Sequence, residues 1–82
     1  MKTIIKLREE IDQIDKEVVK LLIRRMNISR EIGKTKEKIT DKSREMQVIL
    51  NVLNTSEEKI DPLFLREIYE SIIAESKRLQ LG

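Results

Sequence analysis

An apolar seam runs through the first half of this chain and limits the folds that are open to it. Apolar residues recur there at steps of three or four residues, or at their sum: Ile4, Leu7, Ile11, Ile14, Val18, Leu21, Ile28, Ile32 and Ile39. Such spacing is typical of one face of an α-helix. The stretch holds no proline, and its only glycine, Gly33, does not by itself end a helix. The pattern therefore predicts one helix over residues 4–39, about 54 Å long.

A second, shorter helix is predicted after the seam. Either Thr40 or Asp41 can cap its N-terminus, because their side-chain oxygens accept hydrogen bonds from the first backbone N–H groups of a helix. The apolar positions of this helix are Met46, Ile49, Leu50 and Leu53. The polar run over residues 54–56 is predicted to be a loop that follows the helix.

A third helix is predicted from Asp61 and Pro62 to about Leu81. Aspartate is a favourable N-cap, and proline is tolerated at the first helical position, where its missing N–H does no harm. The apolar positions of this helix are Leu65, Ile68, Tyr69, Ile72, Ile73 and Leu79. The chain is therefore predicted to be all-α, with one long and two shorter helices in a single domain over residues 1–82.

The long seam has no counterpart of equal length within the chain. A chain of 82 residues buries only about 60 to 65% of its unfolded surface, and disulfides, metals or oligomerisation usually help chains this short. Cysteine and histidine are absent, which removes disulfides and thiolate or imidazole metal sites and fits a reducing compartment. We therefore expect a homodimer in which two long helices cover each other. The alternative is a monomer whose first helix breaks near Asn27 or Gly33.

The charge pattern limits the partners that we expect. The 17 basic and 15 acidic residues are interspersed, whereas nucleic-acid-binding proteins usually gather their basic residues in one stripe. No apolar run approaches the ~20 residues needed to cross a bilayer, and residues 1–6 turn polar too early for a signal peptide. We therefore expect no nucleic-acid partner, no membrane partner and a cytoplasmic location.

Arg25 stands where the apolar seam calls for a hydrophobic residue. A buried guanidinium needs a carboxylate or an anionic ligand, unless the side chain reaches solvent. Lys36 would lie on the same face of a continuous helix, about 16 Å from Arg25. Arg8 would lie about 25 Å from Arg25, too far to share a small ligand within one chain. In an antiparallel dimer, the partner chain could supply its own Arg8.

The last helix shows a related anomaly near its C-terminal end. Ser76 and Gln80 are four residues apart, and they continue the apolar face with polar groups. Such groups can bond to backbone or water, or they can contact a ligand beside a buried basic pair. Arg44 and Glu45, near the start of the second helix, add one charge of each sign. Ser76 and Gln80 are therefore candidate ligand contacts, whereas Arg44 and Glu45 by themselves indicate little.

The chain resembles the AroQ class of chorismate mutases over nearly its whole length. The similarity is densest over residues 7–15 (LREEIDQID) and over residues 25–36. The polar positions follow the order that is typical of the family: Arg8, Arg25, Lys36, Asp41-Lys42-Ser43-Arg44-Glu45, Glu75, Ser76 and Gln80. The resemblance implies an intertwined helical homodimer with two equivalent sites, each completed by an arginine of the other chain.

The resemblance also implies the reaction, which is the Claisen rearrangement of chorismate to prephenate. This unimolecular step needs no cofactor and no metal. Arg25 and the partner chain's Arg8 would hold the two carboxylates of chorismate, with Arg44 in support. Lys36 and Gln80 would face the ether oxygen.

The ring hydroxyl of chorismate would contact the second helix. By the same resemblance, Glu45 and the backbone near Asp41 would bind this hydroxyl, and Ser76 would lie beside the substrate. The chain departs from the family pattern in its first loop, since residues 37–43 are fewer than is typical. This departure bears on the placement of Asp41 more than on the basic residues of the first helix.

Two other functions are consistent with these residues. Isochorismate-pyruvate lyases resemble this family in fold and in several basic positions, although Glu45, Ser76 and Gln80 favour the mutase. A non-catalytic helical dimerisation or regulatory domain would instead pair Arg25 and Lys36 with glutamates. Such a domain would not bind a dianion that mimics the transition state.

Overall fold

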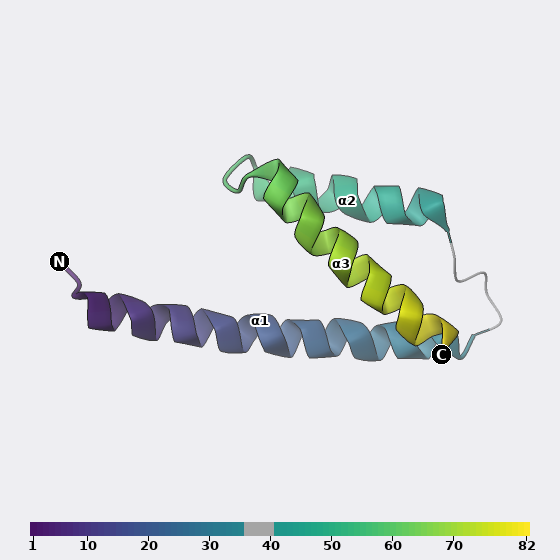
Figure 1. Ribbon diagram of the computed structural model, residues 1–82, viewed down its shortest axis with the longest axis horizontal. Helices are drawn as coiled ribbons and strands as arrows, with labels where there is room; N and C mark the ends of the chain where they lie inside the picture. The colour runs from purple at the N-terminus through teal and green to yellow at the C-terminus, as the bar shows by residue number, and fades with distance from the viewer. Residues whose placement is uncertain (36–40) are drawn as a thin grey trace.

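The computed structural model describes residues 1–35 and 41–82, which form three helices (Figure 1). Helix α1 spans Ile4–Gly33, α2 spans Lys42–Ser56 and α3 spans Pro62–Leu81. No strand occurs in the two described ranges, so the prediction of an all-α fold with one long and two shorter helices is confirmed. None of these helices combines the length and the apolar character needed to cross a membrane.

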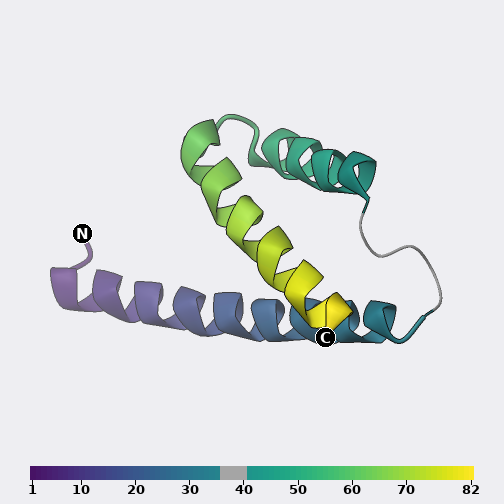
Figure 2. The ribbon, with the colours of Figure 1, turned by 45° about the vertical axis from the view of Figure 1, so that its right-hand side comes forward.

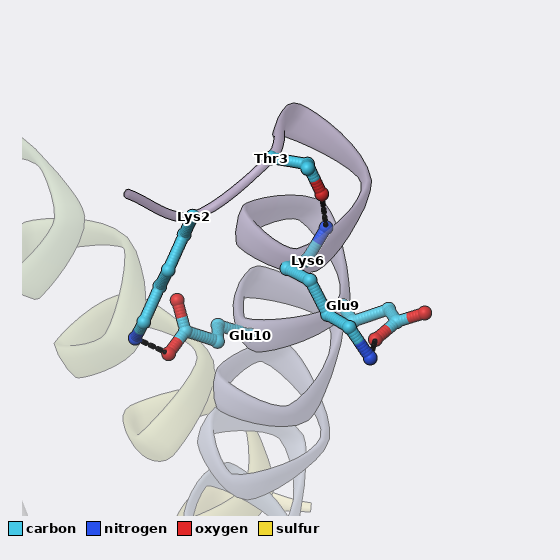
Figure 3. A network of polar contacts seen from close by, with 5 residues as sticks. All are labelled: Lys2, Thr3, Lys6, Glu9 and Glu10. Carbon is cyan, nitrogen blue, oxygen red and sulfur yellow. Dashed lines mark hydrogen bonds and ion pairs between the residues drawn. The ribbon is translucent and has the colours of Figure 1, made fainter.

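Thr3 is the N-cap of α1. Its side-chain oxygen accepts a hydrogen bond from the backbone N–H of Lys6 at 3.2 Å, which satisfies one of the free donors of the first turn. Figure 3 shows this cap beside two ion pairs, Lys2 with Glu10 and Lys6 with Glu9. The side chains of both pairs are at least half exposed, and exposed pairs contribute little stability. The Thr3 cap is therefore the interaction that chiefly stabilises the start of α1.

The C-terminal end of α1 differs from the prediction. The helix runs through Asn27 without a break but ends at Gly33, so the prediction of one continuous helix through Lys34 and Thr35 is wrong, and the rest of its predicted length, residues 36–39, lies outside the described residues. The N–H groups of Lys34 and Thr35 bond to carbonyl oxygens only three residues earlier, at 3.1 and 3.0 Å. This tighter pattern closes the last turn, because it satisfies the carbonyl groups that a helix end leaves free.

Helix α2 begins at one of the two predicted caps. Asp41 is the N-cap, and its Oδ1 accepts a hydrogen bond from the backbone N–H three residues later at 3.2 Å. The predicted loop over residues 54–56 is wrong, since these residues form the last turn of α2. The hydroxyls of Thr55 and Ser56 donate to helix carbonyls at 2.8 and 2.7 Å, so they bond to the helix backbone without interrupting it. The helix ends where Glu57 adopts a left-handed φ of 50°.

Helix α3 begins as predicted and lies between the other two helices. Asp61 is its N-cap, Pro62 takes the first helical position, and Asp61 Oδ2 accepts a hydrogen bond from Phe64 N at 3.3 Å. Helix α3 packs against both α1 and α2, whereas the described residues of α1 and α2 do not approach each other. Within the described ranges, the buried apolar side chains are Ile49 of α2 and Ile73 of α3. The core within one chain is therefore small.

Much of α1 extends away from the other two helices (Figures 1 and 2). Every residue from 1 to 20 is exposed. The seam residues Ile11, Ile14 and Leu21 are 56%, 57% and 62% exposed. Burial of apolar surface stabilises a protein by roughly 25 cal/mol per Å². The apolar surface of the seam thus stays exposed in the isolated chain and does not stabilise it. The length of the predicted helix led to the same expectation, because no other helix of the chain is long enough to cover the seam.

Candidate active site

One cleft is lined by residues of all three helices. It has a volume of about 360 Å³, and its apolar walls are formed by Ile28, Ile32, Val48 and Ile73. The structure brings six of the predicted site residues to this cleft: Arg25, Asp41, Arg44, Glu45, Ser76 and Gln80. Residues that are far apart in the sequence therefore surround one small space, which makes this cleft the candidate active site.

The guanidinium of Arg25 is held in place by helix α3. Its Nη1 donates a hydrogen bond to Ser76 Oγ at 2.5 Å, and Ser76 is buried. The Ser76 hydroxyl points in turn to Met26 Sδ, 3.8 Å away. Arg25 forms no ion pair with any residue of the described ranges, so its other N–H groups are free for an anion in the cleft. Ser76 thus orients the cation in addition to lining the cleft.

Glu45 supplies an acceptor on the side of α2. Its Oε1 pairs with Lys77 Nζ of α3 at 3.4 Å, and about a third of each side chain is exposed. The other oxygen, Oε2, is buried and has no hydrogen-bond partner in the described part of the chain. A buried polar atom without a partner costs free energy. Glu45, which lines the cleft, therefore keeps one carboxylate oxygen whose acceptor capacity is unused among the described residues.

Asp41 and Arg44 lie at the edge of the cleft, at the start of α2. The side chain of Asp41 caps the helix, so one of its oxygens is already used. The Nη1 of Arg44 donates to Gln47 Oε1 at 2.6 Å, and Arg44 is exposed. Arg44 therefore adds a second cation near the entrance of the cleft, in a more solvated position than Arg25.

Gln80 reaches the cleft because α3 crosses α1 at very short range. A Cβ atom on Gly33 would lie 2.5 Å from the carbonyl oxygen of Gln80 and 2.9 Å from its Cα. Real Cβ atoms do not approach other atoms this closely, so only glycine permits this crossing. From the sequence, Gly33 was expected to be tolerated within the helix or, in the alternative, to be a position where the helix breaks. In the structure it determines how closely the Gln80 backbone can approach α1.

Of the predicted site residues that the structure describes, Arg8 does not lie at this cleft. Arg8 is exposed on α1, about 25 Å along the helix from Arg25, so a chain cannot bring its own Arg8 to its own cleft. Lys36 lies outside the described residues. The prediction that placed Lys36 on the same face as Arg25 assumed a continuous helix, and α1 ends at Gly33.

Ser29 and Lys77 line the cleft although they were not predicted. Helical spacing is the one signal that the sequence offers for them, since Ser29 follows Arg25 by four residues and Lys77 follows a buried isoleucine by four, but neither residue type by itself marks a site. Glu75, which belongs to the pattern shared with the family, does not line the cleft. A hydrogen bond from Arg78 lowers the pKa of the Glu75 carboxyl.

The cleft therefore combines cationic donors, one unpaired carboxylate oxygen and apolar walls. Such a site suits a compact organic anion that also carries a hydroxyl group. No cleft residue in the described ranges is a nucleophile with an adjacent base, because the Ser76 hydroxyl is bonded to Arg25 and the Ser29 hydroxyl has no hydrogen-bonded base among these residues. The arrangement favours a reaction that depends on positioning and electrostatic stabilisation.

Comparison with known protein families identifies the family of the chain. The family model described as chorismate mutase type II matches residues 7–81, which include every residue of the cleft. The chain therefore belongs to the chorismate mutase type II family. No curated protein and no solved structure matches the chain.

The variant Gly33→Ala tests the crossing of α1 and α3. At an open helical position, replacing glycine by alanine stabilises a protein by about 1 kcal/mol. At Gly33 the new Cβ would collide with the Gln80 backbone, so we expect the free energy of unfolding to fall by about 1 to 3 kcal/mol. Urea unfolding at a fixed protein concentration measures this change. Glu31→Ala, at an exposed position of the same helix, should change it by less than about 0.5 kcal/mol. A stabilised Gly33→Ala protein would contradict the close crossing.

Proposed function

We propose that this protein is a chorismate mutase, which converts chorismate to prephenate in the biosynthesis of phenylalanine and tyrosine. The observation that carries the proposal is that Arg25, which has no carboxylate partner among the described residues, and the unpaired Glu45 Oε2 belong to one cleft. Membership of the chorismate mutase type II family supports it. Chorismate has two carboxylates, an ether oxygen and a ring hydroxyl, and these groups are complementary to the cleft.

The charged groups of the cleft suggest how the substrate is held. Arg25 binds one carboxylate through the N–H groups that Ser76 does not use, and a bidentate pair of this kind fixes orientation as well as position. Arg44 supports the carboxylates from the edge of the cleft. Glu45 Oε2 accepts a hydrogen bond from the ring hydroxyl, which gives the buried oxygen its missing partner. Asp41 contributes through the backbone at the start of α2.

The reaction needs donors at the ether oxygen, where negative charge develops as the C–O bond breaks. We assign this role to Gln80 and Lys36. The amide of Gln80 is an uncharged donor, and the ammonium of Lys36 adds positive charge. A preorganised donor of this kind typically contributes about 2.7 to 4 kcal/mol to transition-state stabilisation. The rest of the rate enhancement comes from holding chorismate in its reactive chair-like conformer.

A second copy of the chain completes the site in this proposal. The exposed seam of α1 is apolar along residues 4–21, and a second α1 would cover it. Arg8 lies on this uncovered part of the helix, too far from the cleft of its own chain. In an intertwined homodimer, the partner's Arg8 would reach the second carboxylate. This arrangement accounts for both the exposed seam and the position of Arg8.

The direct test is the conversion of chorismate to prephenate by the purified protein. Because Arg25 holds a carboxylate, we expect Arg25→Ala to lower kcat/KM by about 100- to 1000-fold. Loss of chorismate absorbance measures the rate, and chromatography identifies the product. Arg24→Ala is the matched control, because Arg24 is exposed and does not line the cleft.

Each other outcome of this assay contradicts the proposal. If chorismate is not consumed but isochorismate yields pyruvate and salicylate, the protein is an isochorismate-pyruvate lyase on the same scaffold. If neither substrate reacts and a dianionic transition-state mimic does not bind, the protein is a non-catalytic helical module. If Arg25→Ala and the unchanged protein have equal activity, Arg25 does not bind the substrate.

Mixing two inactive variants tests the shared site. In a dimer of Arg8→Ala with Arg25→Ala, one site carries both substitutions and the other carries neither. If the chains assort at random, half of the dimers are mixed, so we expect about one quarter of the original activity to return. The chains are mixed in denaturant and refolded together, and each variant refolded alone is the control. No recovery, or a mass of 9.7 kDa by light scattering, would contradict the dimer.

A further inference from the structure

We infer that Ser29 is an additional substrate-binding residue, whose hydroxyl donates a hydrogen bond to the anion in the cleft. The inference rests on the proposed function and extends its set of ligand contacts. Ser29 is 4% exposed and lines the cleft. Its hydroxyl makes no hydrogen bond to any residue in the described ranges. Ser29 is thus nearly buried as a residue, but its Oγ is not one of the fully buried unpaired atoms, so the hydroxyl stays accessible. A polar group in such a position usually has a partner, in the protein or in a bound molecule.

The position of Ser29 on α1 places it between two of the proposed ligand contacts. Ser29 follows Arg25 by four residues and precedes Gly33 by four, so the three residues lie on one face of the helix about 6 Å apart along its axis. In the proposed site, the guanidinium of Arg25 binds a substrate carboxylate. Gly33 is the residue at which α1 contacts the Gln80 backbone. A ligand that spans Arg25 and Gln80 therefore passes over Ser29.

Packing alone does not explain a serine at this position. A small side chain is needed where α3 crosses α1, but alanine would meet that need and has the higher helix propensity. A helical hydroxyl without a ligand commonly bonds to the carbonyl of the preceding turn, as Thr55 does with Asn51 O at 2.8 Å. Ser29 does not form such a bond in the described structure. Its hydroxyl is therefore available for a partner in the cleft.

The two serines of the cleft have different roles. The Ser76 hydroxyl accepts a hydrogen bond from Arg25 and points to Met26, so it is used within the protein. Ser29 keeps both its donor and its acceptor capacity. The carboxylate and ether oxygens of chorismate only accept hydrogen bonds, so Ser29 acts as the donor. We assign its contact to the ligand oxygens that lie between the Arg25 and Gln80 contacts.

The test compares Ser29→Ala with Ser71→Ala, a serine-to-alanine change at an exposed position of α3. Loss of one hydrogen bond to the ligand should lower kcat/KM of Ser29→Ala about two- to tenfold. Calorimetry should show a loss of similar size in affinity for a bicyclic dicarboxylate that mimics the transition state. The Tm of both variants should stay the same or rise, since alanine favours the helix. Ser71→Ala should keep the original kcat/KM and affinity.

The possible results separate this inference from the proposed function. If the original protein converts chorismate and Ser29→Ala keeps the same kcat/KM and affinity for the mimic, the Ser29 contact is wrong and the function stands. If Ser29→Ala loses activity together with Tm but binds the mimic with unchanged affinity, Ser29 has a packing role and the inference is wrong. If the original protein does not convert chorismate, both proposals fail.

Discussion

The cleft depends on the close crossing of α1 and α3. Gly33 lets the Gln80 backbone occupy space that any other residue would fill, and two turns earlier Arg25 donates a hydrogen bond to Ser76 across the same interface. These two contacts determine which polar groups of α3 lie beside the cation of α1. Among the described residues, helix α2 packs on α3 and not on α1, and Glu45 of α2 pairs with Lys77 of α3. The carboxylate of Glu45 is therefore positioned relative to Arg25 through α3.

The starts of the helices could be predicted from the sequence, whereas two of their ends could not. Capping is a local interaction, so Asp41 and Asp61 identify the starts of α2 and α3. The end of a helix depends on competition between helical and non-helical hydrogen bonds whose free energies are close. The residues at 54–56 have the composition of a loop, yet their hydroxyls bond to helix carbonyls and the helix continues. Conversely, the apolar pattern continues past Gly33, although the backbone hydrogen bonding closes the helix there.

The candidate site was predictable where a residue conflicts with its local pattern. Arg25 interrupts an apolar seam, and Gln80 continues an apolar face as a polar group, so both attract attention in the sequence alone. Gly33 and Ser29 do not, because small residues in a helix look neutral until the position of the crossing helix is known. Lys77 was missed for a similar reason, since a lysine near a helix end is usually solvated and its pairing with Glu45 is a tertiary contact.

We propose that the cleft of one chain and Arg8 of a second chain form one anion site. The most direct measurement is a crystal structure with a bicyclic dicarboxylate that mimics the transition state. We expect the ligand in the cleft, with one carboxylate on Arg25, its hydroxyl on Glu45 Oε2 and its other carboxylate on Arg8 of the partner subunit. A ligand bound outside the cleft, or bound in the cleft of a single chain without a second copy, would contradict the account.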